Sequence, residues 1–232
     1  MSLRWADFPA GVQVTPGASS TGPYLDFTPL VMCGKRLMAY LTNAGSIIMI
    51  DPATNSTVKT ITVPNILGSG TFAAVGMTFD GRNFWISVTD AGGGAPDLIM
   101  HIDQDGNYLN NLIVSNLSIT LGLQGTMRQL THNGRYLYQI QWDGIGGGGS
   151  GGYVEIYDPV SGAMVRQIPG LDEYAGITFD HNHFYLVNID FNVIDMWEGP
   201  MVWRMKQMTN PDGLTYSNGI ACWDRYLIIQ QS

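Results

Sequence analysis

The sequence predicts an all-β chain that folds as a five-bladed β-propeller of four-stranded antiparallel blades. Three observations support this prediction: a hairpin pattern recurs five times, a second hairpin follows each of the first three copies, and no segment combines a helical period with helix caps. The copies begin near residues 30, 76, 127, 176 and 219. Their spacing of about 45 to 50 residues is typical of propeller blades. We expect all 232 residues to form one domain.

The first hairpin of each unit carries the repeat. Residues 76–86, GMTFDGRNFWI, and residues 176–186, GITFDHNHFYL, match nearly position for position. The same outline recurs at residues 31–40, 130–138 and 219–228. Each copy has a short apolar strand, a polar turn, and a second strand rich in aromatic and β-branched residues. This pattern is typical of a β-hairpin.

A second hairpin follows at residues 47–58, 98–108 and 154–165, and less cleanly around residues 201–213. Its turn begins with Asp51, Asp103 or Asp158. Aspartate accepts hydrogen bonds from the turn, proline presets φ, and glycine or asparagine tolerates positive φ. We therefore expect these aspartates to serve their own turns, and we expect the same of Asp80 and Asp180 in the tips of the first hairpins.

The two ends of the chain are expected to meet. The fifth unit stops after its first hairpin, whereas residues 1–29 hold extended candidates at residues 4–8, 12–14 and 24–27. Because a ring whose ends do not pair exposes strand edges, we expect part of residues 1–29 to close the ring beside the last hairpin. The alternative is a loose N-terminal arm. Closure would bring Cys33 and Cys222 into neighbouring units, although a reducing cytosol disfavours a disulfide between them.

Composition excludes several classes of protein. Only 13% of the residues are charged, and 19 acidic against 11 basic side chains give a net charge of -8. Scattered Lys and Arg residues argue against a nucleic-acid partner, because phosphate neutralisation needs basic clusters. No apolar stretch reaches the roughly 18 residues of a membrane helix, and MSLRWADFPAG lacks the apolar core of a signal peptide. We expect no membrane insertion and no signal peptide.

The hairpins IDPATN (residues 50–55) and IYDPVSG (156–162), together with TFDGRNF (78–84), resemble the YVTN and NHL groups of β-propeller repeats. The likeness covers most of residues 30–232. It implies an architecture rather than an activity, because such propellers include enzymes, scaffolds and adhesins. A weaker likeness, to propeller domains in the tails and surface appendages of bacteriophages, rests on a glycine-, asparagine- and aromatic-rich, lysine-poor chain.

Carboxylates at the ends of the second strands are candidate metal ligands. Asp90, Asp143 and Asp190 occupy related positions in three units. If they converge on one face of the ring, they offer the oxygen ligands that Ca²⁺ needs. The alternative is that each carboxylate serves its own loop and that the chain has no cofactor. His181 and His183 lie in a predicted turn with no third ligand in view.

Aromatic and apolar residues outside the regular strand pattern are candidate binding residues. They are Trp142, Tyr153, Phe191, Met196 and Trp197. Aromatic anchors dominate protein interfaces, and they also stack on sugar rings. The segment from residue 190 to residue 200 is unusually apolar for a connecting loop. It is therefore the leading interface candidate.

No Ser-His-Asp elbow, GxGxxG turn, P-loop or HExxH motif occurs in the chain. We therefore expect a non-enzymatic structural or adhesive module that binds other protein subunits of a larger assembly, since low charge and an apolar loop suit burial by partners. The expected setting is the tail or capsid surface of a phage virion, or otherwise the cytoplasm. Two alternatives stay open: a lectin that binds a surface glycan, and a metal-dependent, lactonase-like hydrolase using Asp90, Asp143 and Asp190.

Overall fold

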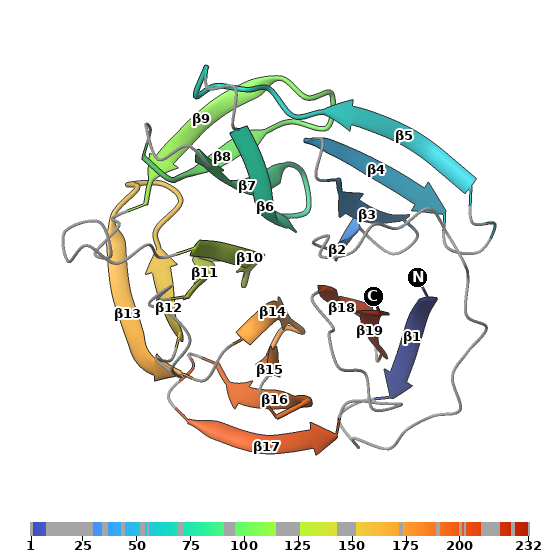
Figure 1. The fold of residues 1–232 in the computed structure, drawn as a ribbon, viewed down its shortest axis with the longest axis vertical. Helices are drawn as coiled ribbons and strands as arrows, with labels where there is room; N and C mark the ends of the chain where they lie inside the picture. Colours follow the sequence, from blue (N-terminus) through green and yellow to red (C-terminus); the bar gives the residue numbers. More distant parts are fainter. Residues whose placement is uncertain are drawn as a thin grey trace.

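The structure is a computed structural model in which every regular element of the described residues is a β-strand. It describes residues 2–7, 30–33, 37–42, 45–51, 54, 56–68, 72–90, 96–114, 126–142, 152–171, 174–188, 191–199, 201, 203–209, 219–223 and 226–231. The sheets stand around a central axis, and each sheet extends outward from that axis (Figure 1). The predicted β-propeller is therefore confirmed. None of the described residues belongs to a helix that could cross a membrane.

Four of the sheets are complete blades whose four antiparallel strands follow one another in chain order. The first blade contains β2 (Leu30–Cys33), β3 (Leu37–Leu41), β4 (Ser46–Asp51) and β5 (Ser56–Thr62). The second contains β6 (Phe72–Phe79), β7 (Phe84–Asp90), β8 (Leu98–Ile102) and β9 (Tyr108–Ile113). The third contains β10 (Thr126–His132), β11 (Leu137–Trp142), β12 (Gly152–Tyr157) and β13 (Met164–Leu171). The fourth contains β14 (Tyr174–Phe179), β15 (His183–Asn188), β16 (Val193–Glu198) and β17 (Arg204–Thr209).

The fifth sheet has only three strands, in the order β1 (Ser2–Asp7), β19 (Tyr226–Gln231), β18 (Gly219–Trp223). The prediction of five four-stranded blades is therefore wrong, because the structure has four. The last repeat contributes one hairpin, and β1 adds a single antiparallel strand to it, with Ser2 opposite Gln231 and Asp7 opposite Tyr226. No described residue occupies the fourth position of this sheet. The N- and C-terminal strands thus share one sheet (Figure 1).

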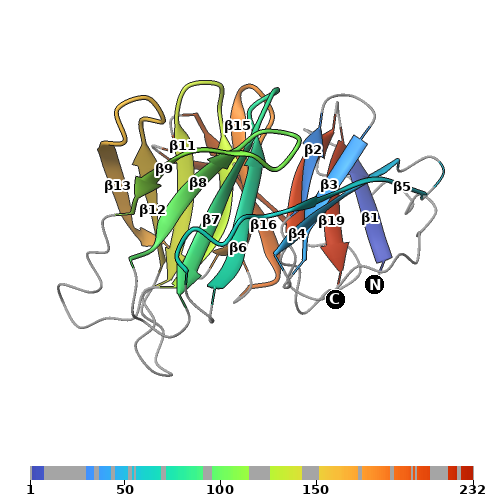
Figure 2. The ribbon, with the colours of Figure 1, turned by 90° about the horizontal axis from the view of Figure 1, so that it is seen from above.

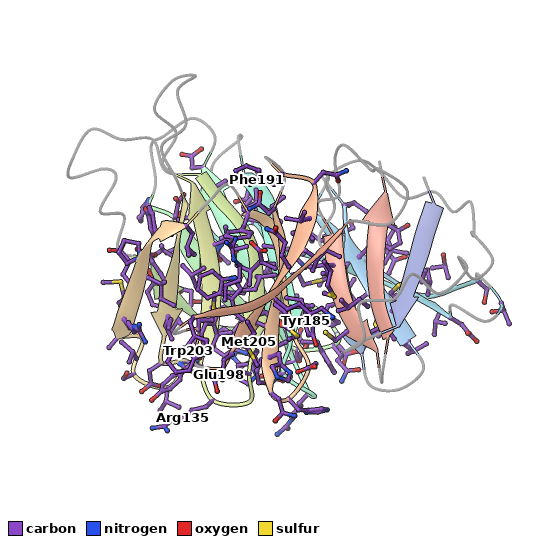
Figure 3. All side chains as sticks on the ribbon, turned by 90° about the horizontal axis from the view of Figure 1, so that it is seen from below. Arg135, Tyr185, Phe191, Glu198, Trp203 and Met205 are labelled. Carbon is purple, nitrogen blue, oxygen red and sulfur yellow. The ribbon has the colours of Figure 1, made fainter. Side chains whose placement is uncertain are left out.

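The innermost strands close the ring. Strands β2, β6, β10, β14 and β18 contact one another in this order, and β18 contacts β2. Seen edge-on, the strands run between two faces of the ring (Figure 2). We call one the Phe191 face, which carries the connections from the second to the third strands. The other is the Trp203 face, which carries the hairpin tips at residues 80–83, 133–136 and 180–182. Phe191 and Trp203 mark these opposite faces in Figure 3.

The core lies between neighbouring blades. Separate apolar clusters fill the spaces between the first and second, second and third, and third and fourth blades, and between the fourth blade and the fifth sheet. A middle strand is covered on both of its faces, so it reads as a continuous apolar run rather than an alternating one. Residues 84–88 of β7, for example, are all buried. A polar residue in such a strand is therefore buried and needs a hydrogen-bond partner within the protein.

Candidate functional site

The hairpin tip after β6 is built around one carboxylate. Asp80 Oδ1 accepts the backbone N–H groups of Arg82 and Asn83 at 2.9 and 2.8 Å. Asp80 Oδ2 accepts the indole N–H of Trp85 at 3.0 Å. Partial burial opposes ionisation, but these three hydrogen bonds, together with the nearby His101, outweigh it and lower the pKa of Asp80. The expected structural role of Asp80 is confirmed.

The same clamp recurs in two other blades. Asp180 binds its own turn in the same way and accepts the hydroxyl of Tyr185 at 3.0 Å. In the third blade Asn133 replaces the aspartate, and its amide donates to the hydroxyl of Tyr138 at 3.0 Å. The aromatic partners Trp85, Tyr138 and Tyr185 are buried. They therefore pack between blades, and in these blades they are not the exposed aromatics that a lectin would repeat.

The turns of the outer hairpins follow the same chemistry. Asp103 accepts the backbone N–H groups of Asp105 and Asn107 at 2.8 and 2.9 Å. Asp158 accepts the N–H of Val160 at 2.8 Å. The hydrogen bond from the Asn107 side-chain amide, at 2.9 Å, is the main cause that lowers the pKa of Asp103, and the Val160 N–H is the main cause that lowers the pKa of Asp158. The expected structural role of these two aspartates is confirmed.

The segment from residue 190 to residue 200 is not a loop, because it contains β16. Met196 is buried in this strand, since both faces of the strand are covered by neighbouring blades. The apolar character that suggested a binding loop is thus that of a middle strand. Phe191 precedes the strand and is 65% exposed, whereas Trp197 lies at its other end and is half-buried. The structure therefore separates Phe191 from Trp197 by the length of the strand.

The remaining predicted binding residues lie in the third blade. Tyr153 is half-buried in β12, opposite Gln141. Trp142 is the last residue of β11 and pairs with Gly152 through its backbone. Its side chain lies outside the described part of the structure. These two positions belong to the Phe191 face, as does the end of β7.

Of the three carboxylates predicted as metal ligands, only Asp90 is described, and it ends β7. Asp143 and Asp190 lie outside the described residues. Within the described residues, no group of three or more His, Cys, Asp and Glu side chains could hold a metal ion. The two cysteines are free thiols, so no disulfide joins Cys33 to Cys222. Burial raises the pKa of Cys33 to about 12.

Apolar side chains are exposed on the Trp203 face between the third and fourth blades. We define the Trp203 surface as Arg135, Tyr136, Glu198, Trp203 and Met205. Trp203 is 59% and Met205 49% exposed. Tyr136 packs on the cluster between the two blades, and the Arg135 guanidinium lies 4.7 Å from its ring centre. Figure 3 shows Arg135, Glu198, Trp203 and Met205 toward the end opposite Phe191.

The turn that presents Trp203 is fixed on its inner side. Met201 is fully buried in the same cluster and adopts a φ of 64°, a left-handed conformation that β-carbon sterics disfavour. The Gly199 N–H donates to the Asn182 carbonyl at 3.1 Å, and a β-carbon on Gly199 would lie 3.0 Å from that oxygen. The Glu198 N–H closes the turn on the Trp203 carbonyl at 3.3 Å. The backbone of Trp203 is therefore anchored to Glu198, next to the buried Met201.

A polar cluster lies between the second and third blades, toward the Phe191 face. We define the Glu155 cluster as Ser87, Asp97, Gln139, Gln141 and Glu155. Gln139, Gln141 and Glu155 are fully buried on adjacent strands β11 and β12. The Ser87 hydroxyl crosses from the second blade and donates to Gln139 Oε1. Glu155 Oε2 accepts the Gln141 amide at 3.3 Å.

The electrostatics of the Glu155 cluster disfavour a free carboxylate. Burial raises the pKa of Glu155, hydrogen bonds from Tyr157 and Gln141 oppose that rise, and the negative charge of Asp97 adds to it. The Tyr157 hydroxyl donates to Glu155 Oε2 at 2.5 Å. Asp97 is itself buried and accepts the Thr89 hydroxyl at 2.5 Å. Sequence reasoning missed this cluster, because its members are single polar residues without a motif.

Comparison with known proteins supports the propeller fold. No family model matches the chain. No curated protein matches it. Among solved structures, the chain resembles the glutaminyl cyclase of Myxococcus xanthus with a TM-score of 0.62 and 14% sequence identity, covering 88% of this chain and 90% of that one. The propeller fold is shared, whereas the YVTN, NHL and phage names gain no support.

This comparison corrects the expectation that the chain is not an enzyme. That expectation rested on the absence of familiar catalytic motifs. A propeller that matches nearly the whole of this fold is a glutaminyl cyclase, so the architecture does carry an enzyme. At 14% identity the likeness extends to the fold alone.

Proposed function

We propose that the chain is a structural or adhesive interaction module and that another protein subunit docks on the Trp203 surface. One observation carries this proposal. Trp203 is 59% exposed on a turn whose inner residue, Met201, is locked in the core. An exposed tryptophan on a rigid support loses little entropy when it is buried by a partner. The larger assembly that we propose as its setting is a phage virion, on grounds of composition.

The chemistry of the Trp203 surface suits a protein partner. Trp, Tyr, Met and Arg are the residue types enriched at protein interfaces, and Trp, Tyr and Arg supply most hot spots. Here a tryptophan and a methionine are flanked by Arg135 and Glu198, one charge of each sign. Such charges can set the orientation of a partner while the apolar side chains supply the affinity.

The test is co-purification of tagged chain from its native assembly, comparing wild type with Trp203→Ala. Truncating a hot-spot tryptophan costs about 2 to 4 kcal/mol, so partner recovery should fall about 30- to 1,000-fold. Val58→Ser is the matched control, because Val58 is 55% exposed on β5 of the first blade. Circular dichroism and thermal melts check that all variants fold. Equal recovery of the same partner by folded Trp203→Ala and wild type would remove this proposal.

A second candidate function is an enzyme. The shared fold with a glutaminyl cyclase favours it, and so does the Glu155 cluster, because buried carboxyls with perturbed pKa values are frequent at catalytic sites. The test is incubation of the chain with a peptide that carries an N-terminal glutaminyl residue, followed by mass spectrometry. A cyclised product formed by wild type but not by Glu155→Gln supports this candidate. The absence of product with folded wild type excludes it for that substrate.

A further inference from the structure

Among the described residues, no hydrogen-bond donor contacts two buried oxygen atoms of the Glu155 cluster. They are Oε1 of Glu155 and Oε1 of Gln141. Both side chains are fully buried, and their other polar atoms face each other at 3.3 Å. Buried polar groups in proteins are nearly always satisfied, so a missing partner is expected here. Because both atoms are acceptors, that partner is a hydrogen-bond donor or a cation.

The charge of the cluster favours a cation over a neutral molecule. Glu155 and Asp97 are buried close enough for the charge of Asp97 to raise the pKa of Glu155. Among the described residues, Glu155 makes no ion pair with a lysine or an arginine. A water molecule would satisfy hydrogen bonds but would leave the repulsion between the two carboxylates in place. A bound cation would both contact the unpaired oxygen atoms and reduce the repulsion between the two carboxylates.

The donor atoms select the kind of cation. The Glu155 cluster offers carboxylate and amide oxygens as ligands, and neither a histidine nor a cysteine belongs to it. Oxygen-only sites are typical of Ca²⁺, which accepts both carboxylates and glutamine carbonyls, whereas Zn²⁺ prefers nitrogen and sulfur ligands. Two carboxylates also balance the charge of a divalent ion.

We propose that the Glu155 cluster binds one calcium ion through oxygen atoms of Glu155, Gln141 and Asp97. Two carboxylates alone are few for calcium, and the Gln141 amide oxygen supplies a third side-chain ligand. This site differs from the one predicted at Asp90, Asp143 and Asp190. The calcium proposal does not depend on which candidate function is correct, because it concerns only the buried residues between the second and third blades.

Calorimetric titration with CaCl₂ after EDTA treatment tests the proposal, together with thermal melts. Wild type should bind one ion and melt a few degrees higher when calcium is present. Glu155→Gln should lose the heat and the shift, whereas Gln141→Met should weaken affinity on the order of tenfold or more. Asp105→Asn is the matched control, because the Asp105 side chain is 75% exposed in a surface pair with Lys59. It should bind calcium as wild type does.

Two results would overturn the proposal. One is a wild type that shows neither heat nor a melting shift with calcium, which would leave a water molecule or a protonated Glu155 to satisfy the cluster. The other is a folded Glu155→Gln that binds calcium as tightly as wild type, which would place the ion elsewhere. If Glu155→Gln does not fold, unchanged affinity in Gln141→Met overturns it instead.

Discussion

Replacing the clamp aspartates by asparagine should cost stability in the second blade but have little effect in the fourth. Asp80→Asn keeps one oxygen for the two turn N–H groups, but its amide then faces the Trp85 indole N–H, which can only donate. Asp180→Asn faces the Tyr185 hydroxyl, which can accept. Asn133 already makes this arrangement with Tyr138, at 3.0 Å.

The magnitude follows from the hydrogen bond that is lost. The Trp85 indole N–H donates to Asp80 Oδ2 at 3.0 Å, and Trp85 is buried. Leaving a buried donor unpaired costs about 1 to 3 kcal/mol, so Asp80→Asn should lose about that much stability. For a chain of this size the melting temperature should fall by about 2 to 4 °C per kcal/mol. Asp180→Asn should change stability by less than about 1 kcal/mol.

Urea unfolding followed by tryptophan fluorescence and by circular dichroism measures both variants. A double-mutant cycle isolates the indole bond: in the Trp85→Phe background, Asp80→Asn should cost much less than it does alone. Equal losses for Asp80→Asn and Asp180→Asn would refute the donor-and-acceptor reasoning. So would an undiminished cost of Asp80→Asn after Trp85→Phe.

Two further outcomes follow from the same structure. Burial raises the pKa of Glu155 above its ordinary 4.5, so the contribution of Glu155 to stability is complete below pH 4.5 and is lost as the pH rises through the folded-state pKa. Urea unfolding in EDTA should show this loss of stability in wild type. In Glu155→Gln the same pH dependence should be absent. Identical pH profiles would contradict the assignment. Gly199→Ala should lose about 1 to 3 kcal/mol, since its β-carbon would lie 3.0 Å from the Asn182 carbonyl, and a melting temperature equal to that of wild type would show that the turn can shift freely.

The hairpins were predictable from the sequence because their determinants are local. An aspartate followed by glycine or asparagine marks the turn, and aromatic and β-branched residues mark the strands, as in residues 76–86. The number of complete blades was not predictable in the same way. A repeat such as residues 219–228 specifies one hairpin, and whether two more strands complete its sheet depends on distant parts of the chain.

The candidate site was predicted only in part, for a related reason. The strand at residues 193–198 has no alternation of apolar and polar residues, because both of its faces are covered. It was therefore predicted as an apolar loop. Glu155 has the opposite appearance, since a single charged residue between Val154 and Ile156 resembles the exposed side of an ordinary strand. Only the packing of the second blade on the third shows that it is buried.

Hydroxyl-radical footprinting of the free chain and of its native assembly tests the proposed docking surface most directly. Trp203 and Met205 are exposed in the free chain and readily oxidised, so their modification should fall strongly in the assembly. Phe191, on the opposite face, and Val58, on the first blade, should keep their reactivity. Unchanged oxidation of Trp203 and Met205 in the assembly, with protection of Phe191 instead, would contradict docking on the Trp203 surface.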